Sequence, residues 1–179
     1  MKKILLIITG GIAIYKVLTL IRLLKKSDYE VQCVMTESAT KLISKQLFAS
    51  ISGNFVRNEL FTDVTSDIVH IDLARWADLT VVAPATANII GKLANGIADD
   101  LASTVLLASD TNVMVAPAMN TEMWNKKPFQ RNLKQIKDDG IIVIEPKDGS
   151  LACGESGKGR MEEPENIFSE IEKYFKGKE

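Results

Sequence analysis

Short runs of consecutive apolar residues alternate along the chain with segments of helical periodicity. Strands are predicted for the runs at 3–9, 31–35, 79–83, 112–115 and 141–144. The first helical segment has apolar residues at the spacing i, i+3, i+4 and i+7, namely Ile14, Val17, Leu18 and Ile21. A second helix is predicted to extend to Leu47, with Ser38 as its N-cap. Further helices are predicted at 68–77, 88–108, 129–139 and 164–176. The helix at 88–108 is expected to be broken, and the helix at 129–139 is expected to end at Gly140.

The strand runs are apolar at successive positions rather than at alternate ones. This pattern is typical of strands that are buried on both faces, as in a parallel sheet covered by helices. We therefore predict an α/β fold: a doubly wound, Rossmann/flavodoxin-like sandwich with a parallel sheet flanked by helices. The 179 residues suit one domain spanning 1–179, since the sequence contains no repeat and no linker.

One long segment, at about 145–163, follows neither the strand pattern nor the helix pattern. Its glycines, its charges and the single cysteine Cys153 predict a flexible clamp over a binding site. The alternative is a disordered surface loop. A lone thiol among glycines fits that alternative poorly, because a structural cysteine is more often buried among apolar residues.

Charge and cysteine usage exclude several classes of protein. Lys and Arg total 22 against 23 for Asp and Glu, so nothing in the net charge of −1 favours nucleic acid as a partner. The apolar start resembles a signal peptide but stops at Gly10 and Gly11, so we expect no membrane span and a cytoplasmic location. Cys33, in a strand-like run, and Cys153 are far apart and give no zinc-ligand spacing, so no metal is expected.

Small residues with isolated polar side chains follow several predicted strands. Gly10 and Gly11 precede the first helix, whose N-terminus can bind a phosphate; an ordinary tight turn is the alternative. After the run at 79–83, Thr86 and Asn88 offer hydrogen bonds among alanines, although either could simply cap a helix. Asn120 is the single amide of the turn after the run at 112–115. These strand ends should meet at one ligand crevice.

His70 is the only histidine, so any mechanism that needs an imidazole must use it. Asp67 and Asp72 are close enough in sequence to tune its charge. Taken alone, an ordinary histidine on a surface helix explains the residue better. A serine hydrolase is disfavoured, because no Gly-x-Ser-x-Gly motif follows a strand.

Five motifs, taken in order, resemble the flavin-containing cysteine decarboxylase family over nearly the whole chain. They are Gly10-Gly11-Ile12-Ala13 with Tyr15-Lys16, His70-Ile71-Asp72-Leu73-Ala74 with Trp76-Ala77-Asp78, Pro84 to Asn88, Pro117 to Asn120 with Met123-Trp124, and Ala152-Cys153-Gly154 with Gly159-Arg160-Met161. The chain departs from the family in one motif, where Thr86 replaces a serine and Ile89 replaces a threonine. Thr86 keeps the hydroxyl, whereas Ile89 removes one contact to the flavin.

The resemblance implies FMN as the cofactor and assigns roles to particular residues. The cofactor-binding residues that it implies are Gly10, Gly11, Ile12, Ala13, Thr36, Ser38, Pro84, Thr86, Ala87, Asn88 and Ser103. The catalytic set that it implies is His70, Asn120 and Cys153. The substrate-binding residues that it implies are Ala118, Met119, Asn120, Ala152, Cys153, Gly154, Arg160 and Met161.

Within the family, the segment around Cys153 is most similar to members that act in coenzyme A biosynthesis. This implies decarboxylation of 4'-phosphopantothenoylcysteine to 4'-phosphopantetheine through a thioaldehyde and an enethiolate, with the difficult electronics supplied by FMN. A neutral amide at Asn120 would orient the carboxylate without over-stabilising the charged ground state. Cys153 would donate the last proton. His70 would either accept the thiol proton or orient the substrate.

The resemblance also implies a homo-oligomer, a trimer or a dodecamer, with each site between subunits. The Met123-Trp124 motif is expected to be exposed for this assembly. Many bacterial relatives continue into a ligase domain, whereas this chain ends at Glu179, so a separate ligase protein is expected. The rivals are a peptidyl-cysteine decarboxylase, a flavin prenyltransferase (disfavoured because Asn120 and Cys153 are both present) and a non-catalytic flavin-binding regulatory subunit, which would typically carry acidic extensions.

Overall fold

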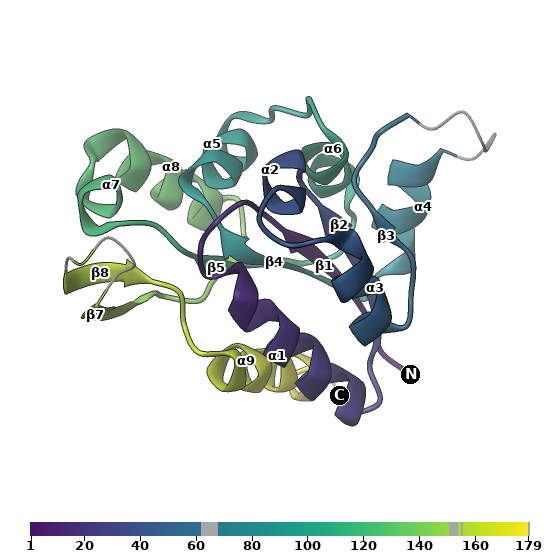
Figure 1. Cartoon of the computed structure of the whole chain (residues 1–179). Coiled ribbons are helices and arrows are strands. Elements are labelled where there is room, and N and C mark those ends of the chain that lie inside the picture. Colours follow the sequence, from purple (N-terminus) through teal and green to yellow (C-terminus); the bar gives the residue numbers. More distant parts are fainter. Residues whose placement is uncertain (62–67, 151–153, 155, 179) are drawn as a thin grey trace.

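The computed structural model describes residues 1–61, 68–150, 154 and 156–178 (Figure 1). Six parallel strands form its main sheet, in the order β3-β2-β1-β4-β5-β6. They are β1 (Lys3–Ile8), β2 (Glu30–Met35), β3 (Val56–Arg57), β4 (Leu79–Ala85), β5 (Val113–Pro117) and β6 (Ile142–Val143). The order reverses between β1 and β4, which makes the edge beyond their carboxyl ends the expected ligand crevice.

Helices cover both faces of this sheet (Figure 1). One face carries α1 (Ile14–Lys26), α3 (Lys45–Ser52) and α9 (Pro164–Lys176). The other face carries α4 (Val69–Trp76), α5 (Ala87–Asn95), α6 (Leu101–Ala108) and α8 (Lys127–Asp138). In β1, Leu6 and Leu5 belong to the two opposite cores. The strand is therefore apolar at every position from Ile4 to Ile8, and the prediction of a doubly wound α/β fold is confirmed.

The helix predicted from Ser38 to Leu47 is wrong, because two helices occupy this region. The short helix α2 (Glu37–Thr40) begins after Thr36, whose hydroxyl accepts a hydrogen bond of 3.3 Å from the backbone amide of Ala39. The helix α3 begins after Ser44, which caps it in the same way. Both capping residues have extended backbone angles, so each starts a new helix. Ser38 therefore lies inside α2 rather than at a cap.

The segment at 145–163, predicted to be irregular, contains an antiparallel ribbon of β7 (Lys147–Ser150) and β8 (Ser156–Arg160). These strands consist of glycine and polar residues, so the apolar pattern that predicted the other strands is absent here. Gly159 has a φ of +133°, and a Cβ on it would lie 2.4 Å from the carbonyl oxygen of Met119. Only glycine therefore allows β8 to approach the loop after β5.

Candidate active site

A cavity of about 390 Å³ lies where the strand order reverses, beyond the carboxyl ends of β1, β4 and β5. This volume lies within the range of roughly 300–1,000 Å³ that small-molecule sites occupy. The residues that line the cavity are Gly10, Gly11, Ile12, Ala13, Tyr15, Lys16, Thr86, Ala87, Ala118, Met119, Asn120, Met123, Gly159, Arg160 and Met161. The strand ends singled out in the sequence therefore meet at one site.

The turn between β1 and α1 provides the first wall. A Cβ on Gly10 would lie 2.5 Å from the Cβ of Ser38, so no larger residue fits there without displacing α2. Within the described chain, no side chain caps α1 at Ala13, and the first turn of α1 contains no acidic residue. The amides of Ile14 and Lys16 already donate to backbone carbonyls of the same turn. Among the described residues, the amides of Ile12, Ala13 and Tyr15 have no such partner and are available to an anion at the cavity.

The start of α5 forms the second wall and is fixed to the first through Thr9. The buried hydroxyl of Thr9 donates a 2.5 Å hydrogen bond to the carbonyl of Pro84 and accepts one of 3.3 Å from the backbone amide of Thr86. Thr86 occupies the N-cap position of α5, but its side chain makes no capping bond there. Its hydroxyl instead lies 3.3 Å from that of Thr9, at the cavity wall.

Asn120 stands at the end of the loop after β5 and caps the short helix α7 (Thr121–Asn125). Its Oδ1 accepts a 2.8 Å hydrogen bond from the backbone amide of Met123. Its NH₂ group donates no hydrogen bond within the described part of the chain. Asn120 is half-buried and lines the cavity. The cap therefore fixes the orientation of the amide and leaves two N–H donors for a ligand.

The strand β8 forms the remaining wall and packs against the loop that carries Asn120. The backbone amide of Met119 donates a 3.0 Å hydrogen bond to the carbonyl of Gly159. The ammonium group of Lys158 lies 5.2 Å from the ring centroid of Trp124. The expectation that Met123 and Trp124 are both exposed is wrong for Trp124, whose side chain is buried against Phe129 and the core.

The structure does not bring every predicted residue to the cavity. His70 lies on α4, which Figure 1 shows on the opposite side of the molecule from α7 and β8. Ser38 lies behind Gly10, and neither Ser38 nor Thr36 belongs to the lining. Pro84 lies behind Gly11, 3.3 Å from the position of an added Cβ.

The remaining predicted residues fall elsewhere. Asn88 is exposed on α5, outside the lining. Gly154 also lies outside it, and Ala152, Cys153 and Asp67 lie outside the described residues.

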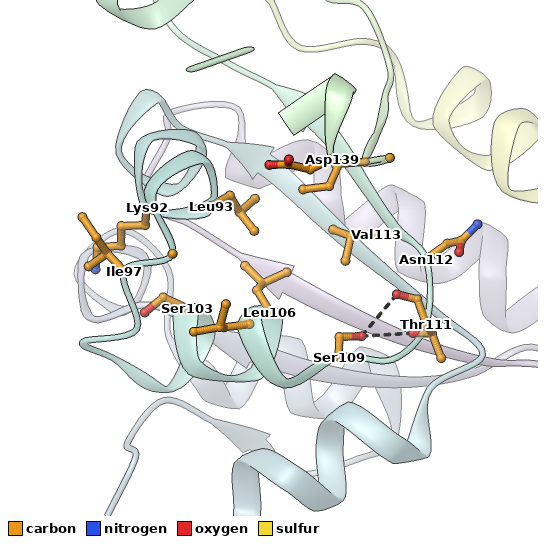
Figure 2. A pocket seen from close by; sticks show the side chains of 14 residues that line it. Lys92, Leu93, Ile97, Ser103, Leu106, Ser109, Thr111, Asn112, Val113 and Asp139 are labelled. Atoms are coloured by element: carbon orange, nitrogen blue, oxygen red, sulfur yellow. Dashed lines mark hydrogen bonds between the residues drawn. The ribbon is translucent and has the colours of Figure 1, made fainter. Parts of the chain in front are cut away.

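Ser103 lies in a second cavity, of about 270 Å³, near the start of β5 (Figure 2). Its backbone amide and hydroxyl form a capping box with Asp100 at the start of α6. Lys92, which pairs with Asp100, and a hydrogen-bonded pair of hydroxyls on Ser109 and Thr111 also line this cavity. In this chain Ser103 therefore fixes a helix end and does not face the cavity that contains Gly10.

Ile89, the departure from the family motif, is buried in the core on the side of α5 away from the cavity lining. A threonine hydroxyl at this buried position would need a hydrogen-bond partner, whereas the apolar side chain of Ile89 needs none. The substitution thus contributes to packing.

Cys33 is also buried, as predicted, and burial raises the pKa of its thiol to about 12. This thiol is neutral and is a poor nucleophile.

Four lining residues were absent from the predicted set: Tyr15, Lys16, Met123 and Gly159. Tyr15 and Met123 are largely exposed, whereas Lys16 is only 7% exposed. The signal for Lys16 was available, because it precedes the buried Leu20 and Leu24 at steps of four residues on α1. A lysine on a buried helical stripe needs a partner or a ligand.

The chain belongs to the flavoprotein family, whose model, described as "Flavoprotein", matches residues 1–176. This membership agrees with the resemblance to flavin-containing cysteine decarboxylases. The coenzyme A biosynthesis bifunctional protein CoaBC of Bacillus subtilis (strain 168) is 47% identical over 97% of this chain. The chain spans 43% of the length of that relative.

Solved structures of related proteins are also similar to this chain. A mutant PPC decarboxylase complexed with pantothenoylaminoethenethiol shares 32% identity and a TM-score of 0.89, and the match covers 98% of both chains. The FMN-binding protein AtHal3 shares 32% identity and a TM-score of 0.85 over 98% of this chain and 97% of its own. Both matches cover nearly the whole chain, so they include the strands and loops that form the cavity.

Proposed function

We propose that this chain binds FMN and decarboxylates 4'-phosphopantothenoylcysteine to 4'-phosphopantetheine, a step of coenzyme A biosynthesis. The observation that carries the proposal is the cavity itself. It joins a glycine turn, with backbone amides available at the start of α1 such as that of Tyr15, to an oriented side-chain amide, Asn120, at the point where the strand order reverses. The similarity to a PPC decarboxylase over 98% of both chains supports this substrate.

The residues present fit FMN. The phosphate would be held by the amides at the start of α1, beside Gly10, where an added side chain would collide with Ser38. The apolar wall formed by Ala87, Ala118 and Met119 suits a flat ring. Thr86 places a hydroxyl at the same wall.

When bound, FMN supplies a reversible hydride acceptor for the cysteine Cβ, which creates the electron sink that loss of carbon dioxide requires. The residues of the chain position the substrate and manage protons. The NH₂ group of Asn120 orients the substrate carboxylate, and as a neutral donor it avoids excessive stabilisation of the charged ground state. Cys153 is proposed to supply the final proton and to belong, with Ala152 and Gly154, to a clamp over the substrate.

The distance of His70 from the cavity supports an assembly in which sites form between subunits. The cavity contains no imidazole, and α4 lies on the other side of the molecule (Figure 1). Ile68 and Phe61, near the start of α4, are 60% and 86% exposed. We propose a trimer, or a dodecamer assembled from trimers, in which His70 of one copy approaches the cavity of another.

Mixing experiments test this arrangement. A His70→Asn variant and an Asn120→Asp variant should each be inactive alone. Mixed oligomers formed by co-expression should regain activity, because some sites would receive both intact residues. Failure of every mixture, in oligomers shown to contain both variants, would mean that the two residues act within one chain.

The location and the partners of the chain remain proposals as well. Within the described part of the chain, no helix has both the length and the apolar character that a membrane span needs. We propose a cytoplasmic enzyme. The CoaBC relative is bifunctional, and a separate ligase as the source of the substrate stays a prediction for this chain.

The absorption spectrum of the purified protein tests cofactor binding, because a flavin gives a yellow protein. Turnover should then be compared for 4'-phosphopantothenoylcysteine and for a peptide that ends in cysteine. We expect release of carbon dioxide from the first substrate only. Selective turnover of the peptide would make this chain a peptidyl-cysteine decarboxylase, whereas flavin binding without either activity would favour a regulatory subunit.

A further inference from the structure

Two cations face each other at the base of the β7–β8 ribbon. Lys147 and Arg160 are direct cross-strand partners, and like charges in such positions repel each other. Each cation is paired with an acid just before α9. The ammonium of Lys147 lies 2.9 Å from Glu162, and the guanidinium of Arg160 lies 2.8 Å from Glu163. The two consecutive acids thus hold one strand each.

Glu163 has a second cationic partner inside the fold. The ammonium of Lys16 donates hydrogen bonds to Glu163 Oε1 at 2.9 Å and to the backbone carbonyl of Met161 at 3.2 Å. The hydrogen bond from Lys16 is the main reason that the pKa of Glu163 is held below its usual value. Lys16 is almost fully buried, so this carboxylate is what balances its charge.

Both cations held by Glu163 also line the cavity of the proposed active site. Lys16 comes from the first turn of α1, beside the glycine turn, and Arg160 comes from the end of β8. The same strand places Gly159 against Met119, next to Asn120. One carboxylate therefore connects the wall at α1 with the wall at β8.

We propose that Glu163 is a positioning residue for the decarboxylation proposed above. It fixes Lys16 and Arg160 on the cavity wall and, through Arg160, fixes the end of β8 beside the loop that carries Asn120. The two cations and one acid leave a net charge of +1 on this wall, which suits a substrate that carries a carboxylate and a phosphate. Glu163 itself does not touch the substrate.

The variant Glu163→Gln tests the proposal, because it keeps the shape and removes the charge. In the FMN-loaded full chain we expect the KM for 4'-phosphopantothenoylcysteine to rise about tenfold. This rise corresponds to a protein in which the binding-competent arrangement of the wall is populated about a tenth of the time. We expect kcat to change less than about twofold, since Glu163 takes no part in the chemistry. A purely electrostatic role predicts the opposite, a lower KM for an anionic substrate on a more positive wall.

A second measurement does not depend on turnover. Hydrogen exchange in the substrate-free protein should be faster at the amides of Lys158, Gly159 and Arg160 in Glu163→Gln than in the parent. The matched control is Glu170→Gln, which removes an acid paired with Lys173 on the exposed surface of α9. That control should leave both KM and exchange unchanged.

The outcomes separate this inference from the proposed function. If the parent protein releases no carbon dioxide from this substrate, the proposed function fails, and the exchange measurement still tests the role of Glu163. An unchanged or lower KM in Glu163→Gln, or unchanged exchange in β8, would overturn the inference. If Glu163→Gln does not fold, Glu163→Asp should show a smaller rise in KM, because its shorter side chain keeps the charge but reaches only one of the two cations.

Discussion

Replacement of Asn120 by Asp separates the structural role of this residue from its proposed role in binding. Asp is as good an N-cap as Asn, so the 2.8 Å bond to the amide of Met123 should persist, with little change in the stability of the fold. The new charge, however, would face the substrate carboxylate. Two like charges about 4 Å apart repel by about 4 kcal/mol at an effective dielectric constant of about 20. This repulsion corresponds to a loss of about 1,000-fold in kcat/KM.

The companion variant Asn120→Ala should behave differently. Loss of the cap costs about 1 kcal/mol, which lowers the unfolding midpoint by about 2–4 °C for a chain of this size. Carbon dioxide release, thermal unfolding and flavin fluorescence should be measured on the parent and on both variants. The reasoning is refuted if Asn120→Asp keeps its activity within about tenfold of the parent, or if it loses FMN, since the amide would then serve the cofactor or the fold.

Three further outcomes are expected. Gly10→Ala should lose FMN affinity, measured by fluorescence titration, because its Cβ would lie 2.5 Å from that of Ser38; unchanged affinity would remove the glycine turn from the cofactor site. Cys153→Ser should release about one carbon dioxide per site and accumulate an enethiol two hydrogens lighter than the normal product by mass spectrometry, because the serine hydroxyl is a far weaker acid; normal turnover would exclude Cys153 as the acid. The pKa of Glu163 is lowered in the fold, so its stabilising contribution should be present above the unfolded value of about 4.3 and lost as pH falls through the lower folded value; thermal unfolding should show this acid-side loss reduced in Glu163→Gln.

The arrangement of the main sheet could be predicted because buried parallel strands leave a strong signal. The run at 4–8 is apolar at every position, which is typical of a sheet covered on both faces. The β7–β8 ribbon leaves no such signal. The strand β8 packs on the loop at Met119 through Gly159, and the sequence does not show which loop a glycine approaches. The split between α2 and α3 was visible in principle, since Thr36 and Ser44 are both typical N-caps.

In the candidate site, too, some features could be predicted from the sequence and others could not. Gly10, Thr86 and Asn120 follow three different strands, and the carboxyl ends of parallel strands meet at one edge, so their grouping followed from the fold class. Ser103 was assigned by resemblance alone. The pattern Asp100-Leu101-Ala102-Ser103 before an apolar helix is a local capping signal, and this role is the one that the structure displays.

The pairing of Lys16 with Glu163 lies beyond what local sequence patterns can provide. The spacing on α1 indicates that Lys16 points inward, and no acid stands three or four residues away to neutralise it. A distant carboxylate is therefore required, but nothing in the sequence says which of the 23 acidic residues supplies it. The packing of α9 against α1 decides this, since it brings the start of α9 to the cavity wall. The cation nearest the glycine turn thus depends on the last helix of the fold, and disruption of α9 packing should affect the site before it affects the sheet.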